Sequence, residues 1–295
     1  MRQPRFGAKS VIFYSEQDGK PKLWVIGGFL SHGDLNSTEL IRPFDADPEF
    51  TQQNRFLFTI ANHTVVKIDP NIVYIIGGTQ NGKESNQTWT VDIDTSPLWG
   101  GNNFIYPNPS CKLKHARSRH SCAKMTLKNG NEIIVVAGGK FQHNGLDSVE
   151  ILEPLLNNRW IIGKMFTTNV KAIIHNLLTT FVIFYISGPK LPFKVYDAEM
   201  ITSPNGHSVV LIGGNTGIIP NNQESDVLLE LSGDSIETLK WNRLDQKLSH
   251  PRYQHLAFLI SEDLFDEMII KEKTIKPKNL KRPRTETNND DYIVL

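Results

Sequence analysis

The stretch EIIVVAGG, residues 132–139, decides the fold, because apolar runs ending in two glycines recur along the chain. The others are LWVIGG at 23–28, VYIIGG at 73–78 and SVVLIGG at 208–214. The second glycines of the four runs, Gly28, Gly78, Gly139 and Gly214, are separated by 50, 61 and 75 residues. A period near 50 residues predicts one small β unit that is repeated along the chain.

Each unit has the residue pattern of four strands. Its apolar run is rich in β-branched residues and apolar on both faces, as in a strand buried between sheets, and the glycines mark a turn. A strand of alternating polarity follows each turn, at 37–41, 87–93, 148–152 and 226–231. A tryptophan segment and a segment led by arginine or histidine complete the unit, the former at Trp99, Trp160 and Trp241 and the latter at 61–69, 116–127 and 251–260. Repeated four-stranded antiparallel units predict an all-β propeller.

The third unit resembles a kelch repeat in its marked residues: Arg117 to Ser121, Gly138-Gly139, Asn144, Asp147 to Glu150 and Trp160. The other units keep parts of this pattern, and the first has Phe50 where a tryptophan would stand. The resemblance covers roughly residues 8 to 260. It implies a kelch-type β-propeller of four-stranded antiparallel blades over 8–262. Such proteins are usually interaction platforms whose central mouth and loops hold a peptide or protein.

The interval between Gly139 and Gly214 is 75 residues, which is longer than the period near 50. It contains KMFTTNVKAIIHNLLTTFVIFYIS at 164–187, and removing this segment restores the normal period. A retained intron is our hypothesis, and a genuine inserted helix or hairpin is the alternative. The apolar part, 172–186, has 15 residues, whereas a bilayer span needs about 20. We therefore expect no membrane span.

The number of blades stays open. Residues 253–260 begin a further blade without a Gly-Gly run, so four to five blades are visible, whereas the relatives that the chain resembles commonly have about six. The ring is either incomplete or closed by residues 10–14, which would complete the last blade. An incomplete ring exposes unpaired strand edges.

The C-terminal region, 263–295, is predicted to be a disordered basic tail. Its stretch KEKTIKPKNLKRPR, 271–284, has seven basic residues and few apolar ones. Three interpretations of this stretch remain open. It is a solvated tail, sequence read from outside the proper exon, or a patch for nuclear import or nucleic-acid contact.

The composition excludes a strong overall electrostatic field. The 295 residues include 32 basic and 31 acidic side chains, a net charge of +1, so nothing draws the propeller to nucleic acid. No secretory signal is visible at the N-terminus; we favour the cytoplasm, and secretion stays open if the N-terminus is truncated. The two cysteines, Cys111 and Cys122, either pair in an oxidising compartment or remain thiols.

Several fragments imitate catalytic or ligand sites. The segment from Gly77 to Lys83 matches a P-loop, but Glu84 stands where a hydroxyl belongs and a strand follows where a P-loop begins a helix. His115, His120 and His143 lack the spacing of metal ligands. A histidine recurs at one repeat position, at 63, 120 and 255, which favours a structural role. No nucleophile motif such as G-x-S-x-G is present. We predict no catalytic residue, metal or cofactor.

The prediction is therefore a non-catalytic module that binds a protein or peptide through its blade loops. Loops after the glycine pairs supply one set of candidate contacts: His32, Gln80, Lys83, Gln142, His143 and Thr216. Loops before the first strands supply the other: Arg117, Arg119, Arg252 and Tyr253. Two alternatives are a propeller enzyme of the copper-oxidase or carbohydrate-acting type, and the substrate-recognition arm of a ubiquitin ligase without its adaptor domain.

Overall fold

The computed structural model describes most of the first 257 residues. The described ranges are 3–14, 19–42, 50–52, 55–68, 72–93, 104–105, 108–154, 185–217 and 223–257. The chain divides into two compact units, Met1–His255 and Leu256–Leu295. Everything below concerns the first unit, and the predicted tail at 263–295 lies outside the described residues.

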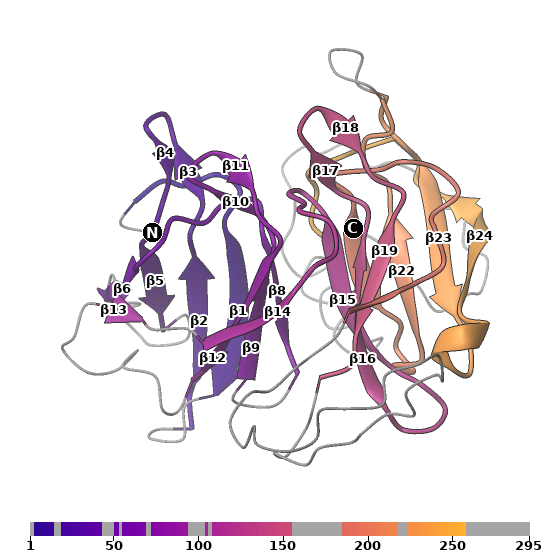
Figure 1. The fold of residues 1–295 in the computed structure, drawn as a ribbon, viewed down its shortest axis with the longest axis horizontal. Coiled ribbons are helices and arrows are strands. Elements are labelled where there is room, and N and C mark those ends of the chain that lie inside the picture. Colours follow the sequence, from indigo (N-terminus) through magenta and orange to yellow (C-terminus); the bar gives the residue numbers. More distant parts are fainter. Residues whose placement is uncertain are drawn as a thin grey trace, which may run out of the picture. The chain divides into compact units, whose positions relative to one another are not determined.

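The described residues of the first unit form four antiparallel sheets of four strands each (Figure 1). Sheet 1 consists of β1 (Lys9–Tyr14), β2 (Pro21–Ile26), β5 (Thr38–Ile41) and β6 (Phe50–Gln52). Sheet 2 consists of β8 (Thr64–Lys67), β9 (Ile72–Ile76), β12 (Gln87–Asp92) and β14 (Asn108–Lys112). Sheet 3 consists of β15 (Ser121–Thr126), β16 (Glu132–Ala137), β19 (Val149–Leu152) and β20 (Tyr185–Ser187). Sheet 4 consists of β21 (Glu199–Thr202), β22 (Ser208–Ile212), β23 (Val227–Ser232) and β24 (Lys240–Lys247).

Short hairpins follow the glycine pairs of sheets 1 to 3 and share one end of the view in Figure 1. They are β3–β4 (Phe29–Leu30 and Gly33–Asp34), β10–β11 (Thr79–Gln80 and Lys83–Glu84) and β17–β18 (Lys140–Phe141 and Asn144–Gly145). In sheet 4 the corresponding segment is a bridge between Asn215 and Glu224. The described residues also form the parallel pair β7 (Arg55–Phe56) and β13 (Phe104–Ile105), and a 3₁₀ turn at Ile236–Thr238.

Glycine is required where the apolar strands end. Gly77 and Gly78 have φ of +58° and +89°, in the left-handed region that favours glycine. A Cβ atom on Gly78 would lie 2.5 Å from the Ala61 carbonyl oxygen and 2.7 Å from the His63 Cβ. The pair therefore turns the chain and lets the segment before the first strand pass close by.

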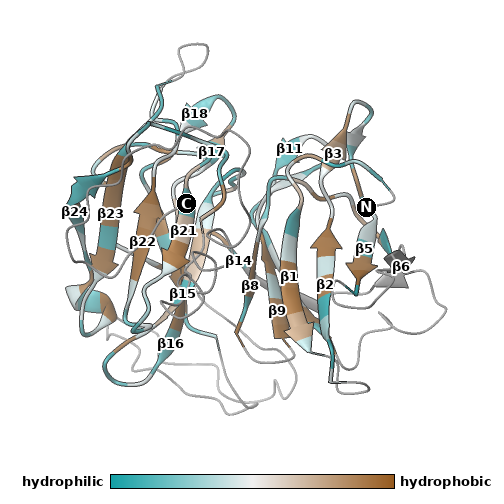
Figure 2. Cartoon of the chain, turned by 180° about the vertical axis from the view of Figure 1, so that it is seen from behind, coloured by the Kyte–Doolittle hydropathy of each residue, from teal (hydrophilic) through white to brown (hydrophobic). Residues whose placement is uncertain are grey.

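Apolar strands are buried on both faces, as their sequence predicts. In β9, Val73 and Ile75 face a core shared with sheet 1, whereas Tyr74 and Ile76 face a core shared with sheet 3. A third core lies between sheets 3 and 4. Figure 2 shows the contrast between apolar β22 and the hydrophilic outer strand β24. Burial between sheets explains why these runs lack polar alternation.

The four sheets follow one another through their first strands. β1 contacts β8, β8 contacts β15 and β15 contacts β21. The Lys9 ammonium on β1 lies 3.3 Å from the Glu199 carboxylate on β21, which links the first and fourth sheets. The fold is thus all-β and propeller-like, and the described residues contain no strand pairing that joins sheet 4 back to sheet 1.

For several segments the structure can be compared with the prediction from the sequence. Residues 10–14 do not complete a last blade; they belong to β1, which pairs with β2 in sheet 1. Residues 185–187, the last three of the predicted insertion, form β20 and pair with β19. Trp241 lies on the fourth strand of its sheet as expected, whereas Trp99, Trp160 and residues 155–184 lie outside the described ranges. In the part of the chain that is described, no helix is long and apolar enough to cross a membrane.

Candidate partner-binding site

One left-handed residue precedes the first strand of every sheet. These residues are Gly7, Asn62, Arg119 and Asp197, and Gln254 holds the same position after sheet 4, with φ between +51° and +60°. We call the five together the inner arc. Four backbone hydrogen bonds join them in order, each N–H donating to the preceding carbonyl at 2.8 to 3.0 Å. The repeat thus places five loops side by side at one end of the sheets.

The neighbouring residues explain this placement. Ala61 bridges to Thr79, Ser118 to Lys140 and Tyr196 to Asn215, so each loop is held by the residue that follows a glycine pair. Asn62 and Asp197 adopt left-handed backbone readily, whereas arginine and glutamine do so less often. Unfavourable backbone at Arg119 and Gln254 directs attention to their side chains as functional candidates.

Polar side chains of the inner arc contact one another. The Arg119 Nη1 atom lies 3.1 Å from Asp197 Oδ2, and Gln254 Nε2 donates to the same oxygen at 3.3 Å. Burial raises the pKa of the Asp197 carboxyl, against the lowering effect of the Arg119 guanidinium. The Arg119 side chain keeps 28% of its surface exposed, so its guanidinium can reach a bound partner.

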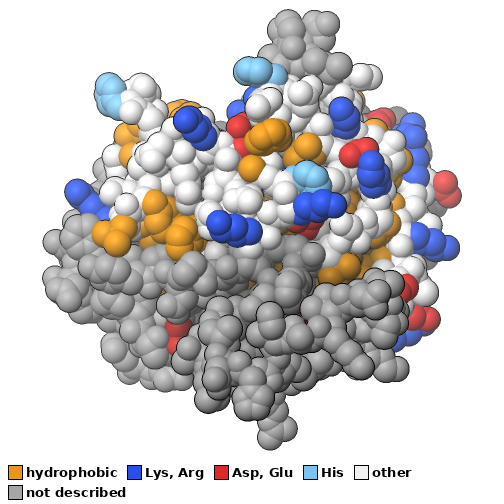
Figure 3. Space-filling view, viewed as in Figure 1, with side chains coloured by type: hydrophobic (Ala, Val, Ile, Leu, Met, Phe, Trp, Pro, Cys, Tyr) orange, Lys and Arg blue, Asp and Glu red, His pale blue; other side chains and the backbone are white. Residues whose placement is uncertain are grey.

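Hairpin tips form the surroundings of the inner arc. The Gly82 N–H donates to Asp34 Oδ2 at 2.9 Å, which ties the hairpin tips of sheets 1 and 2 together. The Asn81 N–H donates to Thr59 Oγ1 at 2.9 Å, which ties the tip of sheet 2 to the loop before β8. Exposed side chains at these tips include four of the predicted contacts, His32, Lys83, Gln142 and His143. Pale-blue histidines project at this end of the surface in Figure 3. Gln80 and Thr216 are half-buried.

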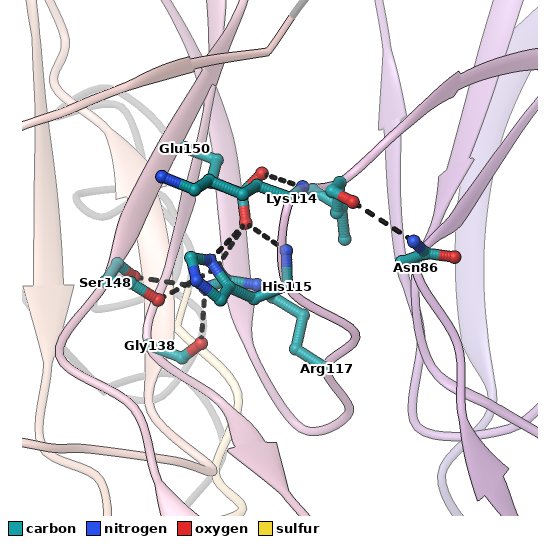
Figure 4. Close-up of polar contacts among 8 residues, drawn as sticks. Asn86, Lys114, His115, Arg117, Gly138, Ser148 and Glu150 are labelled. Atoms are coloured by element: carbon teal, nitrogen blue, oxygen red, sulfur yellow. Dashed lines mark hydrogen bonds and ion pairs between the residues drawn. The ribbon is translucent and has the colours of Figure 1, made fainter.

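Arg117 is not a contact residue, contrary to our expectation, because its side chain is fully buried. Nη1 donates to the carbonyls of Gly138 and Ser148 at 2.7 and 3.0 Å. Nη2 donates to Ser148 Oγ at 2.9 Å and to Glu150 Oε1 at 2.6 Å (Figure 4). Arg117 therefore joins two strands of sheet 3. The Arg, Gly-Gly and Ser-x-Glu pattern, also present in the first repeat, was the signal that could have identified this role.

Sequence reasoning found only part of the arc. It singled out Arg119, but it missed Asn62, Asp197 and Gln254, since no motif marks a left-handed residue. It also placed Arg252 and Tyr253 in these loops, where both are half-buried.

The recurring histidines pack against glycines. A Cβ on Gly77 would lie 2.7 Å from the His120 ring, and one on Gly213 would lie 3.0 Å from the His255 ring. His120 Nε2 lies 2.8 Å from Thr64 Oγ1. Burial, and secondarily Lys9, lowers the pKa of His63 to about 3, so this ring is neutral at pH 7. Among the described residues no three His, Cys, Asp or Glu side chains are grouped as a metal site would require.

Comparison with known proteins shows similarity of fold alone. No family model matches the sequence, and no curated protein matches it. A solved structure titled "Structure of YjhT" is similar, with a TM-score of 0.57 and 14% sequence identity. The match covers 86% of this chain and 74% of that one.

Proposed function

We propose that this chain is a non-catalytic kelch-type β-propeller module that binds a protein or peptide at the end bearing the inner arc and the hairpin tips. One observation carries the proposal: five consecutive loops converge there, and four of them present Asn62, Arg119, Asp197 and Gln254. Loops placed by a rigid scaffold are where proteins commonly bind their partners.

Chemistry at this end suits an extended polar partner. Amide and guanidinium groups of the arc supply donors, and the ion pairs Arg119–Asp197 and Lys9–Glu199 balance in charge. Arginine presents several N–H donors in one plane, which suits a carboxylate or backbone carbonyl. Because the arc carries both charges, it favours a partner with its own polar pattern over a simple polyanion.

Affinity capture with matched variants tests this proposal. The wild-type chain is compared with a double variant, Arg119→Ala with Gln254→Ala, and with Lys128→Ala as the control. Lys128 is exposed in the turn between β15 and β16, at the opposite end of sheet 3. Proteins bound by the wild type and the control, but reduced about tenfold on the double variant, would support binding at the arc. Equal capture by all three chains would contradict it.

A further inference from the structure

Four Asn-Gly dipeptides lie at turns and hairpins of the described chain. Their asparagines are Asn81, Asn129, Asn144 and Asn205. The peptide nitrogen that follows an asparagine can attack the asparagine side chain, and a glycine leaves this nitrogen most accessible because it has no Cβ. Since the four dipeptides have the same covalent chemistry, the fold decides which of them reacts.

In three of the dipeptides the glycine N–H already has an acceptor. The bonds are each 2.9 Å long and run from Gly82 to Asp34 Oδ2, from Gly130 to the Leu127 carbonyl and from Gly206 to the Ser203 carbonyl. A glycine nitrogen must lose its proton before it attacks the asparagine. The attack therefore has to break a hydrogen bond at each of these three sites, which slows it.

The asparagine amides of the same three sites are also hydrogen-bonded. Their oxygens accept as follows: Asn81 Oδ1 from Thr59 Oγ1 at 3.0 Å, Asn129 Oδ1 from the Asn131 N–H at 2.9 Å, and Asn205 Oδ1 from the His207 N–H at 2.9 Å. Rotating an amide toward the following glycine nitrogen would break its bond. These sites are therefore restrained on both reacting groups.

Asn144 has neither restraint. Its side chain is exposed, and its amide has no hydrogen-bond partner among the described residues. The Gly145 N–H likewise has no acceptor in the described part of the chain. Both reacting groups are thus available at this site.

Strand register explains why the Gly145 N–H is available. Antiparallel pairs alternate between hydrogen-bonded and non-hydrogen-bonded ones. The Leu146 N–H donates to the Gly139 carbonyl at 2.8 Å, and Phe141 pairs with Asn144 across the hairpin. Gly145 lies between these two pairs, at the position whose N–H points away from β17.

We propose that Asn144 is a modification site, at which spontaneous deamidation replaces a neutral amide of the β17–β18 hairpin with a carboxylate. Hydroxide takes the proton of the Gly145 nitrogen, which then attacks Asn144 Cγ and forms a cyclic imide. The bond from Cγ to the amide nitrogen breaks, and this nitrogen takes a proton from water and leaves as ammonia. Water opens the imide at either carbonyl, giving aspartate or isoaspartate. The sum consumes one water, releases one ammonia and involves no oxidation.

The new carboxylate lies at the end of the sheets that bears the inner arc. A Cβ on Gly145 would be 3.3 Å from Lys194 Cβ, so the exposed Lys194 passes close to this hairpin. Deamidation thus adds a negative charge near Lys194 and next to His143, one of the candidate contacts. The reaction itself does not depend on the proposed function, because it follows from the hairpin alone.

Mass spectrometry of the aged chain tests the proposal. The full 295-residue chain is kept at mildly alkaline pH, and peptides containing each dipeptide are analysed for aspartate and isoaspartate over time. We expect Asn144 to deamidate about tenfold or more faster than each of the other three, since only they must break hydrogen bonds. In urea the four rates should become similar. Equal rates in the folded chain, or the same excess at Asn144 in urea, would overturn the proposal.

A variant that releases a restrained site is the matched test. Asp34→Ala removes the acceptor of the Gly82 N–H, and Thr59→Ala removes the partner of the Asn81 amide. The double variant should deamidate faster at Asn81, whereas the rate at Asn144 should not change. An unchanged rate at Asn81 would show that these hydrogen bonds do not control the reaction and would overturn the assignment of Asn144.

Discussion

Single residues in this chain show how one repeated backbone position can hold different chemistry. The left-handed positions carry glycine, asparagine, arginine, aspartate and glutamine in turn, yet their backbone bonds are the same. The backbone is set by the fold, because each loop is held between a glycine pair and the next first strand. The side chain is therefore free to vary, which is what a binding surface requires.

His63 is expected to make stability depend on pH. Its folded-state pKa is about 3, whereas an unfolded histidine has a pKa of about 6.5. Below pH 6.5 the unfolded chain binds a proton that the folded chain excludes, so the free energy of unfolding falls by about 1.4 kcal/mol per pH unit. The loss continues until the pH reaches the folded-state pKa. His63→Leu should remove this contribution, as urea unfolding at pH 7 and pH 5 would show.

His32→Leu is the matched control, since His32 is exposed at a hairpin tip. Part of the pH dependence should persist in His63→Leu, because burial also lowers the pKa of His120. An unchanged pH slope in His63→Leu would show that the ring is not excluded from protonation in the folded chain.

The buried Arg117–Glu150 pair is expected to be strongly coupled. Arg117→Val or Glu150→Leu alone should cost about 3–5 kcal/mol of unfolding free energy, because each leaves a charge buried without its partner. The double variant has the same apolar pair as Val195 and Leu229 of sheet 4. It should recover about half or more of the unfolding free energy that a single variant loses. Recovery is incomplete because the N–H groups of Lys114 and His115 also donate to Glu150.

Denaturant unfolding of the two single variants and the double variant measures the coupling. A double variant whose loss equals the sum of the two single losses would contradict a coupled pair. Arg243→Leu, at an exposed position of β24, serves as a surface control for the removal of a positive charge.

At the scale of strands, the sequence predicts those elements whose residue pattern has one physical cause. The four Gly-Gly strands, β2, β9, β16 and β22, were predicted because burial on both faces requires continuous apolar residues. β21 was not predicted, because the segment before it is Tyr196-Asp197-Ala198, in which Ala198 stands where other repeats have histidine. β20 was missed because it lies within a segment that breaks the period, and only its pairing with β19 identifies it.

β1 has an outward face that is expected to promote association. Ile12 and Tyr14 are 51% and 64% exposed, while Phe13 between them is buried in the core with sheet 2. Ile12→Thr with Tyr14→Thr should reduce self-association, measured by light scattering, because it removes adjoining apolar surface. The free energy of unfolding should change by less than about 1 kcal/mol, since threonine suits an exposed strand.

Ser10→Thr, on the same exposed face of β1, is the control for altering this strand. A loss of several kcal/mol in the Ile12 and Tyr14 variant would mean that these side chains support the fold and do not merely cover its surface.

Over the molecule as a whole, stability is built between neighbouring sheets. Among the residues that the structure describes, three apolar cores connect four sheets in order, and the Lys9–Glu199 pair links the first sheet to the fourth. This arrangement of sheets in the order of the chain follows from the repeat and was predictable from the sequence. The end that carries the loops was also predictable, from the glycine pairs. The sequence did not predict which side chains meet at that end, because the contact between Arg119, Asp197 and Gln254 joins three repeats that are distant in sequence.

The most direct test of partner binding at the inner arc is amide hydrogen exchange of the full chain with and without a captured partner. We expect slower exchange in the loops at 59–63, 117–120, 195–198 and 252–255 and at the hairpin tips when the partner is bound. Slower exchange confined to the opposite turns, 127–131 and 203–207, with the arc unchanged, would contradict the proposed site.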